Sequence, residues 1–136
     1  MNIAFLAHDK KKELMVQFCT AYKSVLAKHT LFATASTGRL IAEHTGLNIT
    51  MLYSHKQGGH QQINARIAYN EIDLVLLFSD PNTIDPWDDG QTLETIRNCD
   101  RQNVPIATNL ASAELAIMGL QRGDLDWRDM LHTKKF

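Results

Sequence analysis

Side chains able to bind an anion follow the first apolar run of the chain. Residues 3–7 (Ile-Ala-Phe-Leu-Ala) end at His8-Asp9, and three consecutive lysines, Lys10 to Lys12, come next. Asp9 could cap a helix here, but lysines in the first turn oppose the helix dipole, so helix stability does not explain them. The free N–H groups of a helix start, joined by a nearby lysine, suit phosphate or another anion. A solvated lysine face beside a hydrogen-bonded histidine is the alternative interpretation.

Hydroxyl groups gather in a second loop, residues 34–38 (Thr-Ala-Ser-Thr-Gly), which leads into another predicted helix. Ser36 or Thr37 could act simply as the N-cap, which is the usual role of such residues. One cap needs only one hydroxyl, however. Three hydroxyls beside free N–H groups and a lysine of the first helix would suit the three oxygens of a phosphate monoester.

Two histidines lie in a third loop, residues 54–62 (Ser-His-Lys-Gln-Gly-Gly-His-Gln-Gln), which again leads into a helix. The Gly-Gly pair alone is weak evidence, because it could mark only a turn. A zinc site made of His8, His55 and His60 is conceivable. No compact Cys/His spacing supports such a site, so we expect no metal.

Acidic residues dominate a fourth loop, which begins at Ser79-Asp80-Pro81. Residues 82–91 are predicted to form a long loop that carries Asp85, Trp87, Asp88 and Asp89. Carboxylates at the carboxyl end of a strand can perform acid–base work. Most surface aspartates, however, are solvated turn formers, and that alternative stays open here.

The elements that must position these loops alternate between short apolar strands and longer amphipathic helices. This alternation is typical of an α/β fold, with three layers and a five-stranded parallel sheet covered on both faces. Ligands of such sheets bind beyond the carboxyl ends of the strands, where the four loops lie. The predicted strands are 2–7, 30–34, 48–52, 73–78 and 104–108, and the predicted helices are 10–26, 37–44, 59–71, 92–101 and 112–122. The tail, 123–136, is expected to form a short helix over the domain edge or against a neighbouring subunit.

Length and composition favour one domain, residues 1–136, with a small-molecule partner. The chain is 44% hydrophobic, and 14 Lys and Arg balance 15 Asp and Glu. No polybasic run favours nucleic acid or a membrane surface, and no apolar run is long enough to span a bilayer. Cys19 and Cys99 are too few for a disulfide framework, so a reducing cytoplasm is expected.

The motifs, taken together, resemble the methylglyoxal synthases, and the match to the bacillus-type enzymes is close. The segments that carry the resemblance are IAFLAHDKKK, MVQF, TAY, ATASTG, TGL, GGHQQI, DLVLLF with its following DP, PIATN and DWRDML. The resemblance implies a carbon–oxygen lyase that turns dihydroxyacetone phosphate into methylglyoxal and phosphate. It also implies no metal or organic cofactor, a homohexamer, inhibition by phosphate, and the strand order 3-2-1-4-5.

The resemblance also implies roles for individual residues. His8 and Lys12 match substrate contacts of the family, and Asp9 and Asp80 match acidic residues of its active site. The positions that match the phosphate-binding segment are Thr34, Ala35, Ser36, Thr37 and Ser54.

The chain departs from the family pattern at several site positions. His60 occupies the place of the catalytic aspartate in a GGDQQ motif, and Trp87 occupies that of a histidine that polarises the substrate. A further family acid falls on Gly90, and Asp88 or Asp89 could replace it because the loop is one residue longer. Ala35 and His55 each stand where the family has glycine.

Two functional hypotheses follow from these departures. In the first, the chain is a working lyase in which His60 is the base, since a neutral imidazole can accept a proton near pH 7. In the second, the chain is a catalytically impaired paralogue that binds phosphate or a phosphorylated metabolite as a sensor or regulatory module. A further option is another phosphate-releasing or isomerising activity with His60 as the base.

Overall fold

Five parallel strands form the centre of the molecule and are paired in the order β3-β2-β1-β4-β5. The computed structural model describes the backbone of residues 1–133 and the side chains of residues 1–131. The strands are β1 (Asn2–Ala7), β2 (Thr30–Ala33), β3 (Ile49–Met51), β4 (Leu74–Phe78) and β5 (Ile106–Ala107). Both the predicted strand order and the all-parallel pairing are confirmed.

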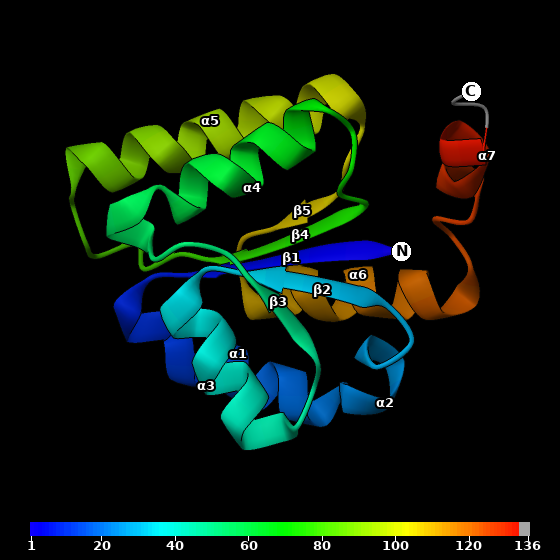
Figure 1. The fold of residues 1–136 in the computed structure, drawn as a ribbon, viewed down its shortest axis with the longest axis horizontal. Helices are drawn as coiled ribbons and strands as arrows, with labels where there is room; N and C mark the ends of the chain where they lie inside the picture. The colour runs from blue at the N-terminus through cyan, green and yellow to red at the C-terminus, as the bar shows by residue number, and fades with distance from the viewer. Residues whose placement is uncertain (134–136) are drawn as a thin grey trace.

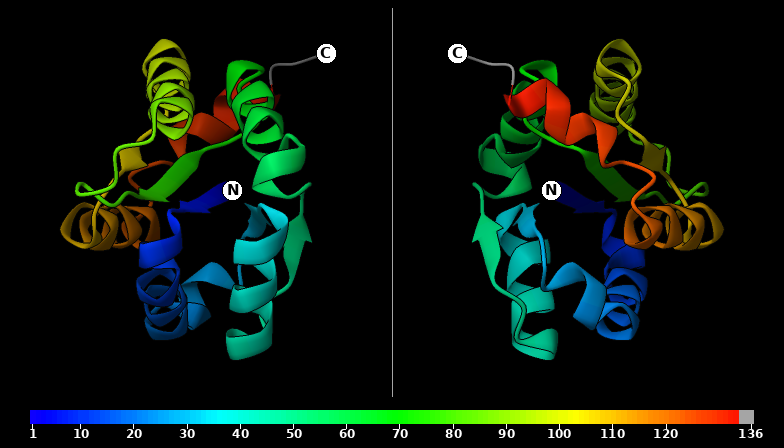
Figure 2. Two further views of the ribbon diagram at one scale, coloured as in Figure 1. Left: turned by 90° about the vertical axis from the view of Figure 1, so that its left-hand side faces the viewer. Right: turned by 90° about the vertical axis from the view of Figure 1, so that its right-hand side faces the viewer.

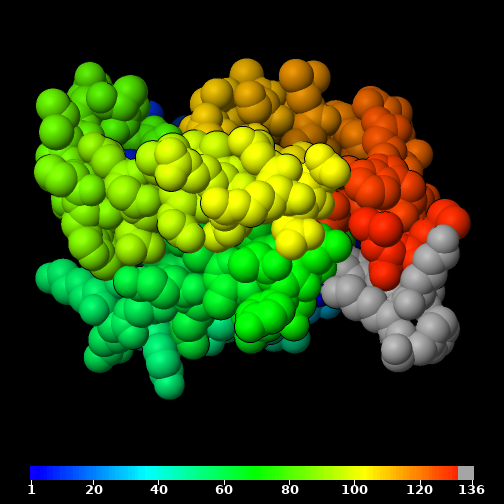
Figure 3. Space-filling model, turned by 90° about the horizontal axis from the view of Figure 1, so that it is seen from above, coloured from blue at the N-terminus to red at the C-terminus, as the bar shows by residue number. Residues whose placement is uncertain are grey.

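Helices cover both faces of this sheet, as Figure 1 shows. On one face lie α1 (Lys12–Ala21), α2 (Lys23–Leu26), α3 (Ala35–Thr45) and α6 (Leu110–Arg122). On the other face α4 (Gly59–Ala68) and α5 (Pro86–Gln102) run side by side, and both are seen from outside in Figure 3, in green and yellow. The predicted three-layer α/β/α architecture is therefore confirmed.

Successive residues of the central strands point to opposite faces, so the sheet separates two apolar cores. Ile3 and Phe5 of β1 face α1, α3 and α6, whereas Ala4 and Leu6 face α4 and α5. All four are at most 5% exposed. A strand buried on both faces reads as an uninterrupted apolar run, which is why residues 3–7 show no polar alternation.

Several element boundaries differ from the predicted ones. The first predicted helix is divided at Tyr22 into α1 and α2, and a 3₁₀ turn, η1 (Asp9–Lys11), precedes it. The predicted loop 82–91 is wrong in its second half, because α5 begins at Pro86. Proline is favoured in the first turn of a helix, and Asp85 caps this one by accepting hydrogen bonds from the N–H groups of Trp87 and Asp88.

The tail forms the predicted short helix, α7 (Trp127–Thr133), which lies at the amino ends of the strands, opposite the four loops. Residues 134–136 of the predicted tail lie outside the described part of the chain. The anchor of α7 is Arg128, whose side chain is fully buried. Its Nε donates to Asp73 Oδ1 at 2.9 Å, and its other nitrogens donate to the Asn70 side chain and to the carbonyl oxygens of Ile72, Gln102 and Asn103.

Removal of this guanidinium is expected to destabilise the fold strongly. Arg128→Met would leave the Asp73 carboxylate and several carbonyl oxygens buried with fewer partners, so urea denaturation should show a loss of about 3–5 kcal/mol in unfolding free energy. Arg122→Met is the matched control, because Arg122 forms a largely exposed ion pair with Asp124 and should contribute at most about 1 kcal/mol. Equal losses in the two variants would contradict this role of Arg128.

Candidate active site

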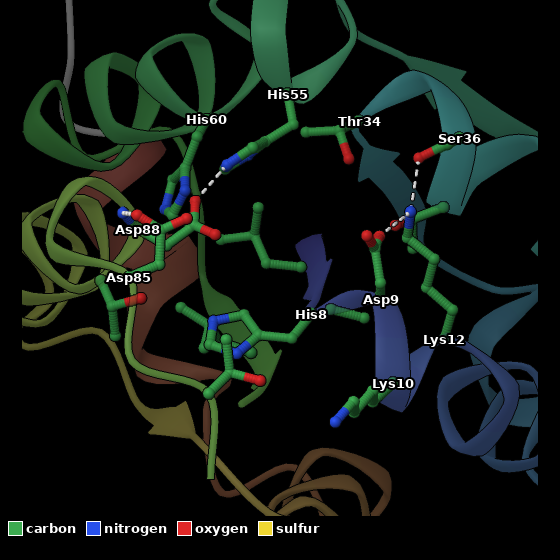
Figure 4. A pocket seen from close by; sticks show the side chains of 16 residues that line it. His8, Asp9, Lys10, Lys12, Thr34, Ser36, His55, His60, Asp85 and Asp88 are labelled. Atoms are coloured by element: carbon green, nitrogen blue, oxygen red, sulfur yellow. Dashed lines mark hydrogen bonds and ion pairs between the residues drawn. The ribbon is translucent and has the colours of Figure 1, made fainter. Parts of the chain in front are cut away.

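A cavity of about 330 Å³ lies at the carboxyl ends of β1, β2 and β4, where the loops after these strands meet. Figure 2 (left) looks onto this end of the sheet, and Figure 4 shows the side chains from close by. The lining residues come from β1 and its loop, the start of α1, α3, η2 (His55–Gln57), α4, β4 and its loop, and the start of α5. Among the predicted site residues, the cavity wall includes His8, Asp9, Lys12, Thr34, Ser36, Thr37, His55 and His60.

One end of the cavity is suited to an anion. Lys12 Nζ lies 2.9 Å from Ser36 Oγ and 2.8 Å from Asp9 Oδ1, so the ammonium is held beside the first turn of α3. Thr34 occupies the N-cap position of α3, but its hydroxyl caps no N–H group. Hydroxyls, an ammonium and the positive end of a helix dipole therefore converge at one place, as an anion site requires.

Asp9 does not cap the first helix, contrary to the sequence-based prediction. His8 holds the N-cap position of η1, without a side-chain cap, and the Asp9 carboxylate instead binds Lys12. The Lys12 ammonium, through its hydrogen bond and its charge, lowers the pKa of Asp9. The Asp9 carboxylate is almost fully exposed, so its clearest structural effect is to orient Lys12.

The backbone of the loop after β4 holds the His8 ring in place. The N–H group of Asp80 donates to His8 Nδ1 at 2.9 Å. Because Nδ1 is an acceptor there, the neutral ring carries its proton on Nε2 and is a hydrogen-bond donor. The ring lines the cavity, where Figure 4 shows it near the centre.

The Asp80 carboxylate lies outside the cavity wall. It accepts hydrogen bonds from the Thr83 hydroxyl and the Asn82 N–H group, and these two bonds, in that order of importance, lower the pKa of Asp80. The residue is 6% exposed. Asp80 therefore fixes the turn that carries Thr83 to the cavity and orients His8 through its own backbone.

His60 is the deepest titratable residue of the cavity and is only 4% exposed. Its Nε2 lies 2.8 Å from Thr95 Oγ1, whereas Nδ1 has no hydrogen-bond partner among the described residues. Burial, with a smaller effect of the nearby His55, lowers the pKa of His60 to about 4. The imidazole is thus neutral at pH 7, and it is a weaker base than the sequence-based hypothesis assumed.

His55 Nε2 and Asp88 Oδ1 lie within hydrogen-bond distance of each other at the cavity wall. The centroid of the His55 ring also lies 5.6 Å from that of the His60 ring. It lies 4.8 Å from that of the Trp87 ring, in an edge-to-face arrangement. Of the two aspartates that the sequence left open, Asp88 lines the cavity and Asp89 does not. Trp87 is 47% exposed and contacts His55 from outside the cavity wall.

The Gly58-Gly59 pair has a specific structural function. Gly58, which joins η2 to α4, has a backbone φ of +96°, a value that residues with a side chain rarely adopt. A Cβ on Gly59 would lie 2.0 Å from the carbonyl oxygen of Tyr53, so only glycine fits there. The pair therefore allows the close turn that places both His55 and His60 on the cavity.

Sequence reasoning identified most, but not all, of this cavity. The structure does not place Ala35, Ser54 or Trp87 on its wall, although all three belong to the neighbouring segments. Thr83 and Thr92 are lining residues that the sequence analysis missed, because threonine in a loop or at a helix start gives no distinctive signal. The remaining lining residues are Leu6, Ala7, Lys10, Leu77 and Asp85.

Known proteins resemble this chain over most of its length. A family model described as "MGS-like domain" matches residues 14–108. A methylglyoxal synthase of Caldicellulosiruptor saccharolyticus is 55% identical over 135 residues, covering 98% of this chain and 94% of the relative. One of Oceanobacillus iheyensis is 48% identical, covering 99% and 96% respectively.

The fold likewise resembles a solved structure. The crystal structure of methylglyoxal synthase from Elizabethkingia anophelis superposes with a TM-score of 0.76 at 35% sequence identity, covering 85% of this chain and 76% of the other.

Proposed function

Because the chain belongs to the methylglyoxal synthase family, we propose that it is a lyase that converts dihydroxyacetone phosphate into methylglyoxal and inorganic phosphate. The observation that supports this most strongly is the meeting of two features in one cavity. An anion site around Lys12 and Ser36 lies at one end, and a buried neutral imidazole, His60, lines the same space. The proposed reaction needs no metal or organic cofactor.

In the proposed complex, the phosphate group binds at the start of α3. The Lys12 ammonium and the hydroxyls of Thr34, Ser36 and Thr37 surround it, and Asp9 keeps Lys12 in place. A charged group bound so firmly also holds the rest of a small substrate in one orientation, which is a large part of the catalytic effect.

The chemistry then proceeds by proton removal and elimination. His60 takes a proton from the hydroxymethyl carbon, and the resulting enediolate expels phosphate by breaking the C–O bond. Tautomerisation of the remaining enol gives methylglyoxal. Because the pKa of His60 is about 4, the imidazolium is a strong acid for a histidine and readily releases the proton again.

His8 supplies the donor that the developing enediolate requires. Its Nε2–H group is available because Asp80 N–H occupies Nδ1. One such donor is typically worth about 10²- to 10³-fold in rate. His8 thus takes the role of the histidine that Trp87 replaces, while Asp80 and Asp9 act through the neighbours that they position.

The decisive assay follows methylglyoxal and phosphate release from dihydroxyacetone phosphate. The wild-type protein should produce both in equal amounts, and His60→Ala should lower kcat by about 10²- to 10⁴-fold while inorganic phosphate still binds. A wild-type protein that binds phosphate without turnover, together with a His60→Asp variant that gains turnover, would instead identify a binding module.

The pH profile provides a second check on His60. Since its pKa is lowered to about 4, kcat should stay level as the pH falls from 7 to 5 and decrease only near pH 4. The unfolded histidine titrates near 6.5, so the folded state also loses stability as the pH falls from 6.5 to 4. Circular dichroism at each pH separates these effects, and a decrease in kcat centred near pH 6.5 in folded protein would contradict the proposal.

Substitution of Lys12 should weaken binding more than chemistry. Lys12→Met removes the ammonium beside Ser36, so the Kd for inorganic phosphate and the KM for substrate should rise about tenfold or more. Lys11→Met is the matched control, because Lys11 belongs to the same lysine run but does not line the cavity. Calorimetric titration with phosphate measures the Kd of each variant, and steady-state kinetics give the KM. Equal changes in Lys12→Met and Lys11→Met would exclude a specific role for Lys12.

The assembly and location of the protein are part of the same proposal. We expect a homohexamer in the cytoplasm. Assembly is supported by the large apolar side chains that are exposed on α6 and α7, including Leu115, Met118 and Met130, as subunit contacts would require. Cys19 and Cys99 are free and buried, and free thiols suit a reducing compartment. Sedimentation of the purified protein measures its assembly, and a monomer would contradict the proposal.

None of the described helices combines the length and the apolar character needed to cross a membrane.

A further inference from the structure

A buried polar chain connects His60 to the interior between α4 and α5. His60 Nε2 lies 2.8 Å from Thr95 Oγ1, and Thr95 Oγ1 lies 2.6 Å from Asn64 Oδ1 and 2.9 Å from the carbonyl oxygen of Gln91. All three side chains are almost completely buried, with exposures of 4% for His60, 0% for Thr95 and 6% for Asn64. Thr95 and Asn64 do not line the cavity, and the hydrogen bond between Thr95 and His60 links them to it.

The number of donors and acceptors around the Thr95 hydroxyl decides which nitrogen of His60 carries the proton. A threonine hydroxyl has one proton to donate, and two of its three neighbours, Asn64 Oδ1 and the Gln91 carbonyl, are pure acceptors. The Thr95 proton therefore goes to one of these oxygens. Its oxygen then accepts from His60, which places the ring proton on Nε2.

The opposite tautomer would be costly at this depth. A proton on Nδ1 would be a buried donor without a partner among the described residues, and Nε2 would compete for the single Thr95 proton. Buried donors without a partner are rarer in proteins than under-used acceptors, because the desolvation of an N–H group is not recovered. The Nε2–H form leaves Nδ1 as a bare acceptor instead.

We propose that Thr95, supported by Asn64, is a positioning residue that holds His60 as the Nε2–H tautomer, so that Nδ1 is the atom that takes the substrate proton. This inference rests on the proposed function and deepens it. The proton leaves the substrate carbon and forms a bond to Nδ1, while the proton on Nε2 stays in its hydrogen bond to Thr95. The ring is thereby kept in one orientation and one protonation form before the substrate binds.

Nitrogen-15 NMR of the wild-type protein tests the tautomer directly and without substrate. The His60 signals, assigned by their loss in His60→Gln, should show a protonated Nε2 and an unprotonated Nδ1 at pH 7. A proton on Nδ1, or an equal mixture of both forms, would overturn the inference. This readout does not depend on turnover, so failure to form methylglyoxal would refute the proposed function but leave the tautomer measurable.

Variants of Thr95 test its positioning role. Thr95→Val keeps the shape but removes the acceptor, so the spectrum should show a mixture of tautomers and kcat should fall by roughly 10- to 100-fold, with KM changed less than about twofold. Thr95→Ser retains the hydroxyl and should restore both the single tautomer and most of kcat.

The matched control is Thr45→Val. Thr45 is a buried threonine whose hydroxyl lies within hydrogen-bond distance of the carbonyl oxygen four residues earlier, as that of Thr95 does, but it lies away from the cavity. It should leave the His60 spectrum and kcat unchanged. An equal loss of kcat in Thr45→Val and Thr95→Val, or an unchanged His60 spectrum in Thr95→Val, would show that Thr95 has no specific effect on His60.

Discussion

The parallel pairing of β1 with both β2 and β4 is the constraint on which the rest of the structure depends. Parallel neighbours bring their carboxyl ends to the same edge of the sheet, and Phe5 is opposite Ala33 on one side and Leu76 on the other. The loops that begin at His8, Thr34 and Ser79 are therefore adjacent, although they lie far apart in the chain. The packing of β1 on both faces keeps this register, because a slip of one residue would move Ile3 and Phe5 into the core that now holds the differently sized Ala4 and Leu6.

Charge within the cavity is arranged so that a cation and a neutral base can coexist. The Lys12 ammonium is paired with the Asp9 carboxylate, and His55 Nε2 contacts the Asp88 carboxylate, so each of these two groups has an acidic partner of its own. His60 is buried and neutral, with a basicity lowered toward that of a carboxylate. A neutral imidazole can occupy the position of an aspartate without its charge, provided that a neighbouring group such as Thr95 fixes which ring nitrogen carries the proton.

The opposite end of the sheet contributes stability rather than chemistry. Arg128 joins α7 to Asp73 and to four other positions near the amino ends of the strands. Such a buried ion pair is favourable only when the hydrogen-bonding capacity of both partners is largely satisfied, and here the guanidinium donates from every nitrogen. The sequence-based expectation of a short helix in the tail was confirmed for residues 127–133. The role of Arg128 was missed, because an arginine in a charged segment does not indicate burial.

By itself, the sequence determined the layers and the approximate ends of the strands, because apolar runs such as 3–7 and 74–78 must be buried on both faces wherever they occur. It also indicated the anion site, since hydroxyls and lysines at the start of a helix are able to bind an anion wherever they occur. Tertiary structure alone decided that Asp88 rather than Asp89 reaches the cavity, and that Thr95 contacts His60. Those facts depend on how α4 and α5 pack together, and contacts between residues 35 positions apart leave no periodic trace in the chain.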